Sequence, residues 1–103
     1  MVNCQSCKKD LSQEKEKTLI ASICGSIMGD EYIESWYFCN ECQAYTLEIY
    51  HDRFLGEEDI SLKGPIPKTE GDEKVKLIGQ CSTPWDKKCR CAAHRSYFGD
   101  WLD

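Results

Sequence analysis

The chain has 103 residues, of which 41% are hydrophobic and 30% charged, and its formal net charge is −5. These values are ordinary for a small globular domain, and no apolar run approaches the roughly 20 residues that cross a membrane as a helix. The net negative charge is unfavourable for binding a polyanion. After residues 1–4 the sequence turns polar and shows no secretory signal, which predicts a cytoplasmic protein whose thiols stay reduced.

The first chemical feature is a pair of CxxC sequences, Cys4-Gln5-Ser6-Cys7 and Cys39-Asn40-Glu41-Cys42. Each pair can wrap one ion, and four thiolates complete the tetrahedral ligand set of a structural zinc. A domain this small also gains from a metal or disulfide staple, because its core buries limited apolar surface. We therefore predict one zinc ion (site 1) at Cys4, Cys7, Cys39 and Cys42. Covalent haem is excluded because histidine follows neither pair.

Strand patterns lie around these pairs. Residues 18–24 are rich in apolar and β-branched types, and two glycines within 25–30 indicate a turn. Residues 31–38 and 45–50 alternate between apolar and polar types, as in strands with one buried face. The order of hook, strand, strand, hook and strand over residues 1–54 resembles that of the zinc-ribbon fold group. The resemblance implies a three-stranded antiparallel sheet with both metal-bearing turns at one end.

Two positions depart from that resemblance. Zinc-ribbon hooks often carry glycine just after the second cysteine, where a positive φ is needed. Here Lys8 and Gln43 occupy those positions. The same substitution weakens a rubredoxin-like iron interpretation, although a redox or iron–thiolate protein remains an alternative to zinc.

The composition of the chain changes after residue 54. Acidic residues at 57–59 and the Gly-Pro-Ile-Pro sequence at 64–67 predict an irregular connection over 55–72. Thr69 and the acids after it favour a helix start, so a helix is expected over about 70–80. The domain organisation predicted is a zinc ribbon at 1–54, this connection, and a helix with a C-terminal metal subdomain at 73–103, all packed as one unit.

The second chemical feature lies in the C-terminal subdomain, where three cysteines and a histidine fall within a short stretch. Together they supply a complete Cys₃His ligand count for zinc. We therefore predict a second zinc (site 2) at Cys81, Cys89, Cys91 and His94, with His94 in the first turn of a following helix. The spacing matches no motif that identifies a family, so ordinary cysteines beside a surface histidine remain the alternative.

The remaining candidates have plainer interpretations. The eight cysteines could form disulfides, but seven of them are tightly clustered, as metal ligation requires. Cys24 lies within a predicted strand and is expected to be a small buried hydrophobe. His51 is expected to be a solvated histidine near a strand end.

The fold class predicted is therefore a small metal-stabilised α+β protein. Both ligand sets are full, and a catalytic zinc normally keeps an open position, so no enzymatic activity is expected. The expected function is that of a non-catalytic protein-interaction or regulatory module with a protein partner. A nucleic-acid-associated ribbon is the alternative, because Lys87, Lys88, Arg90 and Arg95 make one loop basic. Those cations are equally explained as compensation for the negative charge of a thiolate-rich zinc site.

Overall fold

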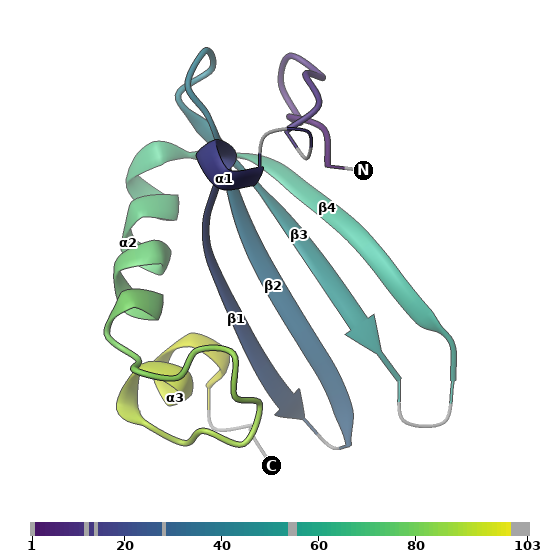
Figure 1. The fold of residues 1–103 in the computed structure, drawn as a ribbon, viewed down its shortest axis with the longest axis vertical. Helices are drawn as coiled ribbons and strands as arrows, with labels where there is room; N and C mark the ends of the chain where they lie inside the picture. The colour runs from purple at the N-terminus through teal and green to yellow at the C-terminus, as the bar shows by residue number, and fades with distance from the viewer. Residues whose placement is uncertain (1, 12, 14, 28, 54–55, 100–103) are drawn as a thin grey trace.

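The computed structural model describes residues 2–11, 13, 15–27, 29–53 and 56–99. Four long strands form one antiparallel sheet in the order β1-β2-β3-β4 (Figure 1). The elements, in chain order, are α1 (Lys15–Thr18), β1 (Leu19–Ile27), β2 (Asp30–Cys39), β3 (Ala44–Asp52), β4 (Glu58–Pro67), α2 (Lys68–Gly79) and α3 (Ala92–Phe98).

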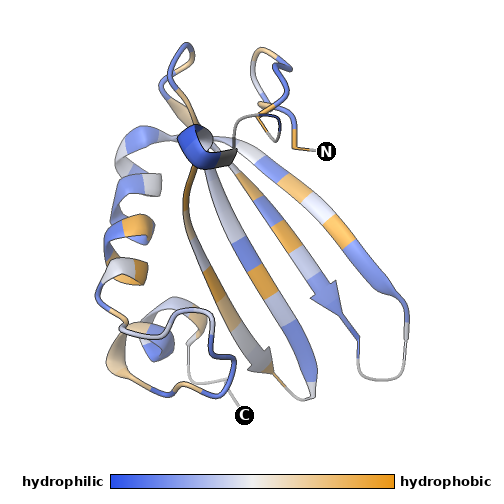
Figure 2. Ribbon diagram, viewed as in Figure 1, coloured by the Kyte–Doolittle hydropathy of each residue, from blue (hydrophilic) through white to orange (hydrophobic). Residues whose placement is uncertain are grey.

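One face of the sheet carries the main core. Apolar and polar positions alternate along the strands (Figure 2), because successive side chains of a strand point to opposite faces. The apolar set packs against α2 and α3 in a buried cluster of Ile23, Trp36, Tyr45, Leu47 and Ile78. The predicted alternation of residues 31–38 and 45–50 is thus what places Trp36 and Leu47 inside.

A glycine lets α2 lie close to this face. A Cβ at Gly71 would come within 2.1 Å of the Tyr45 ring, so any side chain there would push the helix away. The Tyr45 hydroxyl also donates to Asp72 at 2.5 Å, which fixes the first turn of α2 over β3. The glycine that interrupts the helical pattern therefore has a packing role.

The opposite face carries a second cluster next to the N-terminal segment. Val2, Cys4 and Leu11 pack there with Tyr37 and Cys39 of β2. Leu11 donates its N–H to the Val2 carbonyl at 2.7 Å, which closes residues 2–11 into a small hairpin. The N-terminal segment is thereby held at the end of the sheet where β2 turns into β3.

The sheet corrects the predicted three-stranded ribbon, because it has four strands. The fourth, β4, lies in the segment 55–72 that was expected to be irregular. The prediction was wrong because it took Pro65 and Pro67 as evidence against a strand. Proline is excluded from central strands but tolerated at an edge, and β4 is an edge strand. A register shift between Tyr45 and Leu47 accommodates the Gly64-Pro65 pair. The helix expected over about 70–80 is present as α2, and it begins directly after Pro67.

Candidate metal centres

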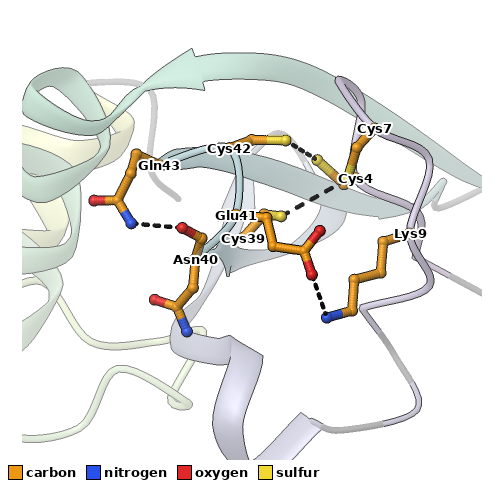
Figure 3. A network of polar contacts seen from close by, with 8 residues as sticks. All are labelled: Cys4, Cys7, Lys9, Cys39, Asn40, Glu41, Cys42 and Gln43. Carbon is orange, nitrogen blue, oxygen red and sulfur yellow. Dashed lines mark hydrogen bonds and ion pairs between the residues drawn. The ribbon is translucent and has the colours of Figure 1, made fainter.

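The first cluster joins two turns from distant parts of the chain. Cys4 and Cys7 lie in the N-terminal hairpin, Cys39 is the last residue of β2, and Cys42 lies in the turn that leads to β3. Figure 3 shows the four side chains converging between the two turns, with Lys9 of one turn paired to Glu41 of the other at 3.4 Å. This exposed ion pair is a minor tether.

The sulfur positions fit one tetrahedral ion. The Sγ atoms of Cys4 and Cys42 lie 3.8 Å apart, as do those of Cys7 and Cys39. All four sulfurs lie within 4.8 Å of one another. A tetrahedral zinc with bonds of about 2.3 Å places its sulfurs about 3.8 Å apart. The cluster could therefore hold one metal ion without rearrangement.

Both turns reach the conformation for which glycine is usually selected. Lys8 has φ 67° and Gln43 has φ 52°. Their N–H groups donate to the carbonyls of Cys4, at 2.9 Å, and Cys39, at 2.8 Å. The side chain of Gln43 adds a bond to the Asn40 carbonyl at 2.7 Å. The absence of glycine, which the sequence presents as a departure from the ribbon pattern, did not prevent the turns from forming.

The thiols of site 1 differ sharply in acidity. Burial raises the pKa of Cys4, but hydrogen bonds from the backbone N–H groups of Cys7 and Ser6 and from neighbouring thiols outweigh it and lower the pKa to about 7. A hydrogen bond with the Ser6 side chain favours the Cys42 thiolate, yet the thiols of Cys7, Cys4 and Cys39 raise the Cys42 pKa to about 12. Clustered thiolates repel one another, and a bound cation would remove this conflict.

The second cluster is drawn from the loop after α2 and the start of α3. The Sγ atoms of Cys81 and Cys89 lie 3.7 Å apart, and His94 Nδ1 lies 3.1 Å from Cys81 Sγ and 3.6 Å from Cys91 Sγ. All four ligand atoms lie within 4.8 Å of one another. Sulfur and nitrogen ligands of a tetrahedral zinc are about 3.5 Å apart, given bonds of about 2.3 and 2.0 Å. This group too could hold one metal ion.

His94 is oriented by a second contact. The side chain is fully buried, and its Nε2 lies 2.9 Å from the carbonyl oxygen of Cys24 on β1. A carbonyl accepts only, so Nε2 carries the proton and donates it, which leaves the Nδ1 lone pair facing the cysteines. Metal-ligating histidines are commonly fixed by such a bond from the other ring nitrogen.

The backbone of β1 also forms a hydrogen bond with the loop that carries the cysteines of site 2. Cys24 donates its N–H to the Pro84 carbonyl at 2.8 Å. Further along, Trp36 Nε1 donates to the Tyr97 hydroxyl at 2.8 Å, and that hydroxyl donates to Glu34 at 2.6 Å. A Cβ at Gly25 would meet the Phe98 ring at 2.7 Å, so α3 lies directly on β1. Site 2 is therefore docked against the edge and face of the sheet.

The thiols of site 2 repeat the contrast seen in site 1. A hydrogen bond from the Thr83 side chain and one from the Cys91 backbone lower the pKa of Cys89 to about 7. Burial and the neighbouring thiols of Cys91 and Cys89 raise the pKa of Cys81 to about 11. One thiolate forms readily in each cluster, and further ionisation needs a compensating charge.

Two other residues, Cys24 and His51, make contacts that the sequence did not reveal. Cys24 lies outside both clusters and is only half-buried, and its backbone, not its thiol, supports site 2. His51 is not the solvated histidine that was expected, because its side chain is only 20% exposed. It stacks on Tyr32 with ring centroids 4.3 Å apart, and its Nε2 lies 2.9 Å from Asp30. No local signal could have shown these contacts, because each depends on strand pairing.

Two cations of the basic loop contact other residues of the protein. Lys87 forms an ion pair with Glu31 at the end of the sheet. Arg90 Nη1 donates to the carbonyls of Lys87, at 2.9 Å, and Cys89, at 3.0 Å. Two of the four cations thus brace the loop around site 2.

Comparison of the chain with protein-family models, with curated proteins and with solved structures finds no match. The resemblance to zinc ribbons therefore rests on the hooks and the strand order alone. Within the described residues, none of the helices combines the length and apolarity that a membrane crossing requires.

Proposed function

We propose that the protein binds two zinc ions, one in each cluster, and that both ions are structural. The observation that carries the proposal is that each cluster presents four ligand atoms within 4.8 Å of one another. Thiolate-rich sets of this kind favour zinc over harder cations such as magnesium and calcium. Within this proposal the N-terminal half is a ribbon-like module whose sheet contains β4 in addition to the three strands of a zinc ribbon.

The inward orientation of His94 supports a non-catalytic role. A catalytic zinc keeps one position for water or substrate. With Nδ1 of His94 facing the cysteines, site 2 has a fourth ligand in reach, and site 1 has four thiolates. Sulfur ligands also donate charge to the ion, which makes it a weaker Lewis acid.

The module is proposed to act through protein contacts. Several large apolar side chains are exposed, and among the described residues Trp85 at 70% and Ile60 at 64% are the most accessible. The net charge of −5 disfavours nucleic acid, and Glu31 neutralises one cation of the basic loop, Lys87.

The deciding experiment is metal analysis of protein purified without chelator. Two zinc ions per chain, with no visible absorption, are expected. Visible bands would reveal an iron–thiolate site and overturn the zinc assignment. One ion per chain, together with rapid alkylation of Cys81, Cys89 and Cys91, would remove site 2 from the proposal.

A further inference from the structure

The two edges of the sheet differ in whether other parts of the chain cover their backbone groups. The edge of β1 is covered, because Cys24 bonds to Pro84 and His94 at 2.8 and 2.9 Å. The outer edge of β4 has no such cover: in the part of the chain that the structure describes, no backbone hydrogen bond outside the β3–β4 ladder involves β4. In Figure 1 the outer side of β4 borders open space except near Gly64, where the N-terminal segment lies beside the strand. An uncovered edge is a template for another strand.

The pairing pattern shows which groups of β4 point outward. In an antiparallel sheet, hydrogen-bonded and non-hydrogen-bonded pairs alternate across each strand. The N–H and C=O of Cys24 point away from β2, so Cys24 and its β2 partner Ile33 form a non-hydrogen-bonded pair. The N–H and C=O of Ile33 therefore point toward β3, where they bond to Tyr50. The N–H and C=O of Tyr50 consequently point toward β2 and away from its β4 partner, Ile60. The outward-facing backbone groups are therefore those of Glu58, Ile60 and Leu62.

The exposed part of β4 is complementary to itself. Residues 59–63 read Asp-Ile-Ser-Leu-Lys, with an acid at one end, a base at the other and serine in the centre. We infer that two copies of the chain form a symmetric dimer by antiparallel pairing of their β4 strands, centred on Ser61. In this register Asp59 lies opposite Lys63 of the second copy and Ile60 lies opposite Leu62. Two-fold symmetry repeats each pair.

The register agrees with the backbone pattern. Ile60 and Leu62 are the residues with outward N–H and C=O groups, so they exchange hydrogen bonds across the new interface. Asp59 and Lys63 fall in non-hydrogen-bonded pairs, where opposing side chains are closest. A slip of one residue would place opposite faces of the sheet side by side. A slip of two residues, centred on Ile60, would put Asp59 opposite Ser61 and lose both ion pairs.

The side chains are available for this pairing. Ile60 is 64% exposed, and Lys63 is exposed with no ion-pair partner among the described residues. Asp59 contacts Arg53 through Oδ2 at 2.6 Å, which leaves its other carboxylate oxygen to accept from Lys63 of the second copy. The match between both ends of one short strand favours a second copy of this chain over a foreign strand.

The extent of the interface is limited by proline. Pro65 and Pro67 have no N–H to donate, so regular pairing ends near Gly64. An interface of this length lies at the small end of the range for specific complexes. The dimer is therefore expected to be weak and to depend on protein concentration. It involves neither cluster and does not rest on the identity of the metal.

The test is sedimentation of the full chain, as purified with its metal, over a range of concentrations at low salt. Asp59→Lys and Lys63→Asp each place like charges opposite one another twice, and each should weaken dimerisation about tenfold or more. The double variant exchanges the charges and should restore the dimer to within about threefold. Glu57→Lys makes the same charge change as Asp59→Lys outside the paired segment and should have no effect.

Ile60→Pro provides a test of the backbone contacts. The Ile60 N–H points outward, so proline there removes a donor from the interface and leaves the β3–β4 ladder intact. This variant should stay folded by NMR and sediment as a monomer. A wild-type chain that remains monomeric at about millimolar concentration would overturn the inference. A dimer that ignores these substitutions, or single reversals that the double variant fails to rescue, would also overturn it.

Discussion

The two candidate metal clusters contain similar residues but draw them from different spans of the chain. Site 1 joins segments far apart in the chain, since Cys7 and Cys39 are separated by 32 positions. Site 2 draws its ligands from one short stretch, with Cys81 and His94 separated by 13 positions. The first cluster therefore ties the N-terminal hairpin to the sheet, whereas the second shapes a loop with little regular structure of its own.

Their surroundings differ accordingly. The cysteines of site 1 lie in turns that carry their own backbone hydrogen bonds and positive-φ residues. Site 2 depends on the sheet, because His94 and Pro84 both bond to the backbone of Cys24. A local turn can organise itself around an ion, but an irregular loop also needs an external surface.

Loss of site 1 should have the largest effect. Cys39→Ser removes a buried ligand at the end of β2, and structural zinc contributes on the order of 10–16 kcal/mol of apparent binding free energy, comparable with the stability of a small domain. The hairpin of residues 2–11 and the sheet should unfold together, seen as loss of dispersion in the NMR spectrum. Cys24→Ser is the matched control, because Cys24 belongs to neither cluster, and it should retain both ions.

Loss of site 2 should be confined to the C-terminal region. His94→Ala removes a ligand and the bond to Cys24, so the metal content should fall from two ions to one per chain. Amide exchange should accelerate in α3 and at Cys24, while β2 and β3 stay protected. His51→Ala should change neither readout. Global unfolding of the His94 variant would show that the two regions form a single cooperative unit.

The contact between α3 and the sheet should have an intermediate effect. Tyr97→Phe leaves the Trp36 N–H and Glu34 without their shared hydroxyl partner, at a cost of about 1–3 kcal/mol in the free energy of unfolding. Zinc content should not change. Tyr50→Phe removes an exposed hydroxyl that donates to Glu58, and its cost in the free energy of unfolding should be smaller than that of Tyr97→Phe. Urea unfolding followed by circular dichroism compares the two variants.

The turns of site 1 should give the smallest effect, and of opposite sign. Lys8→Gly removes the side chain that makes the left-handed backbone conformation at this position unfavourable. The free energy of unfolding should therefore rise by up to about 1 kcal/mol. Gln43→Gly should gain less, because it also loses the bond to the Asn40 carbonyl. A lower urea midpoint for the Lys8 variant would show that its φ of 67° carries no strain.

Sequence reasoning succeeded where the determining contacts are local. A CxxC turn brings its two thiols together whatever the rest of the chain does, and alternation places Trp36 and Leu47 on one face. The grouping of Cys81, Cys89, Cys91 and His94 follows in the same way from their closeness in the chain. These features indicated the two ligand clusters and the strands that carry them.

Tertiary structure alone decided the remainder. Whether Glu58–Pro67 becomes a strand depends on β3 offering a free edge, so the prolines could not settle it in isolation. The role of the Cys24 backbone and the choice of His94 Nδ1 as the inward nitrogen arise from residues 70 positions apart. The exposed edge of β4 likewise exists only because the strand order places it last. Long-range pairing leaves no mark in a local pattern, which is the physical reason that these features appear only in the folded chain.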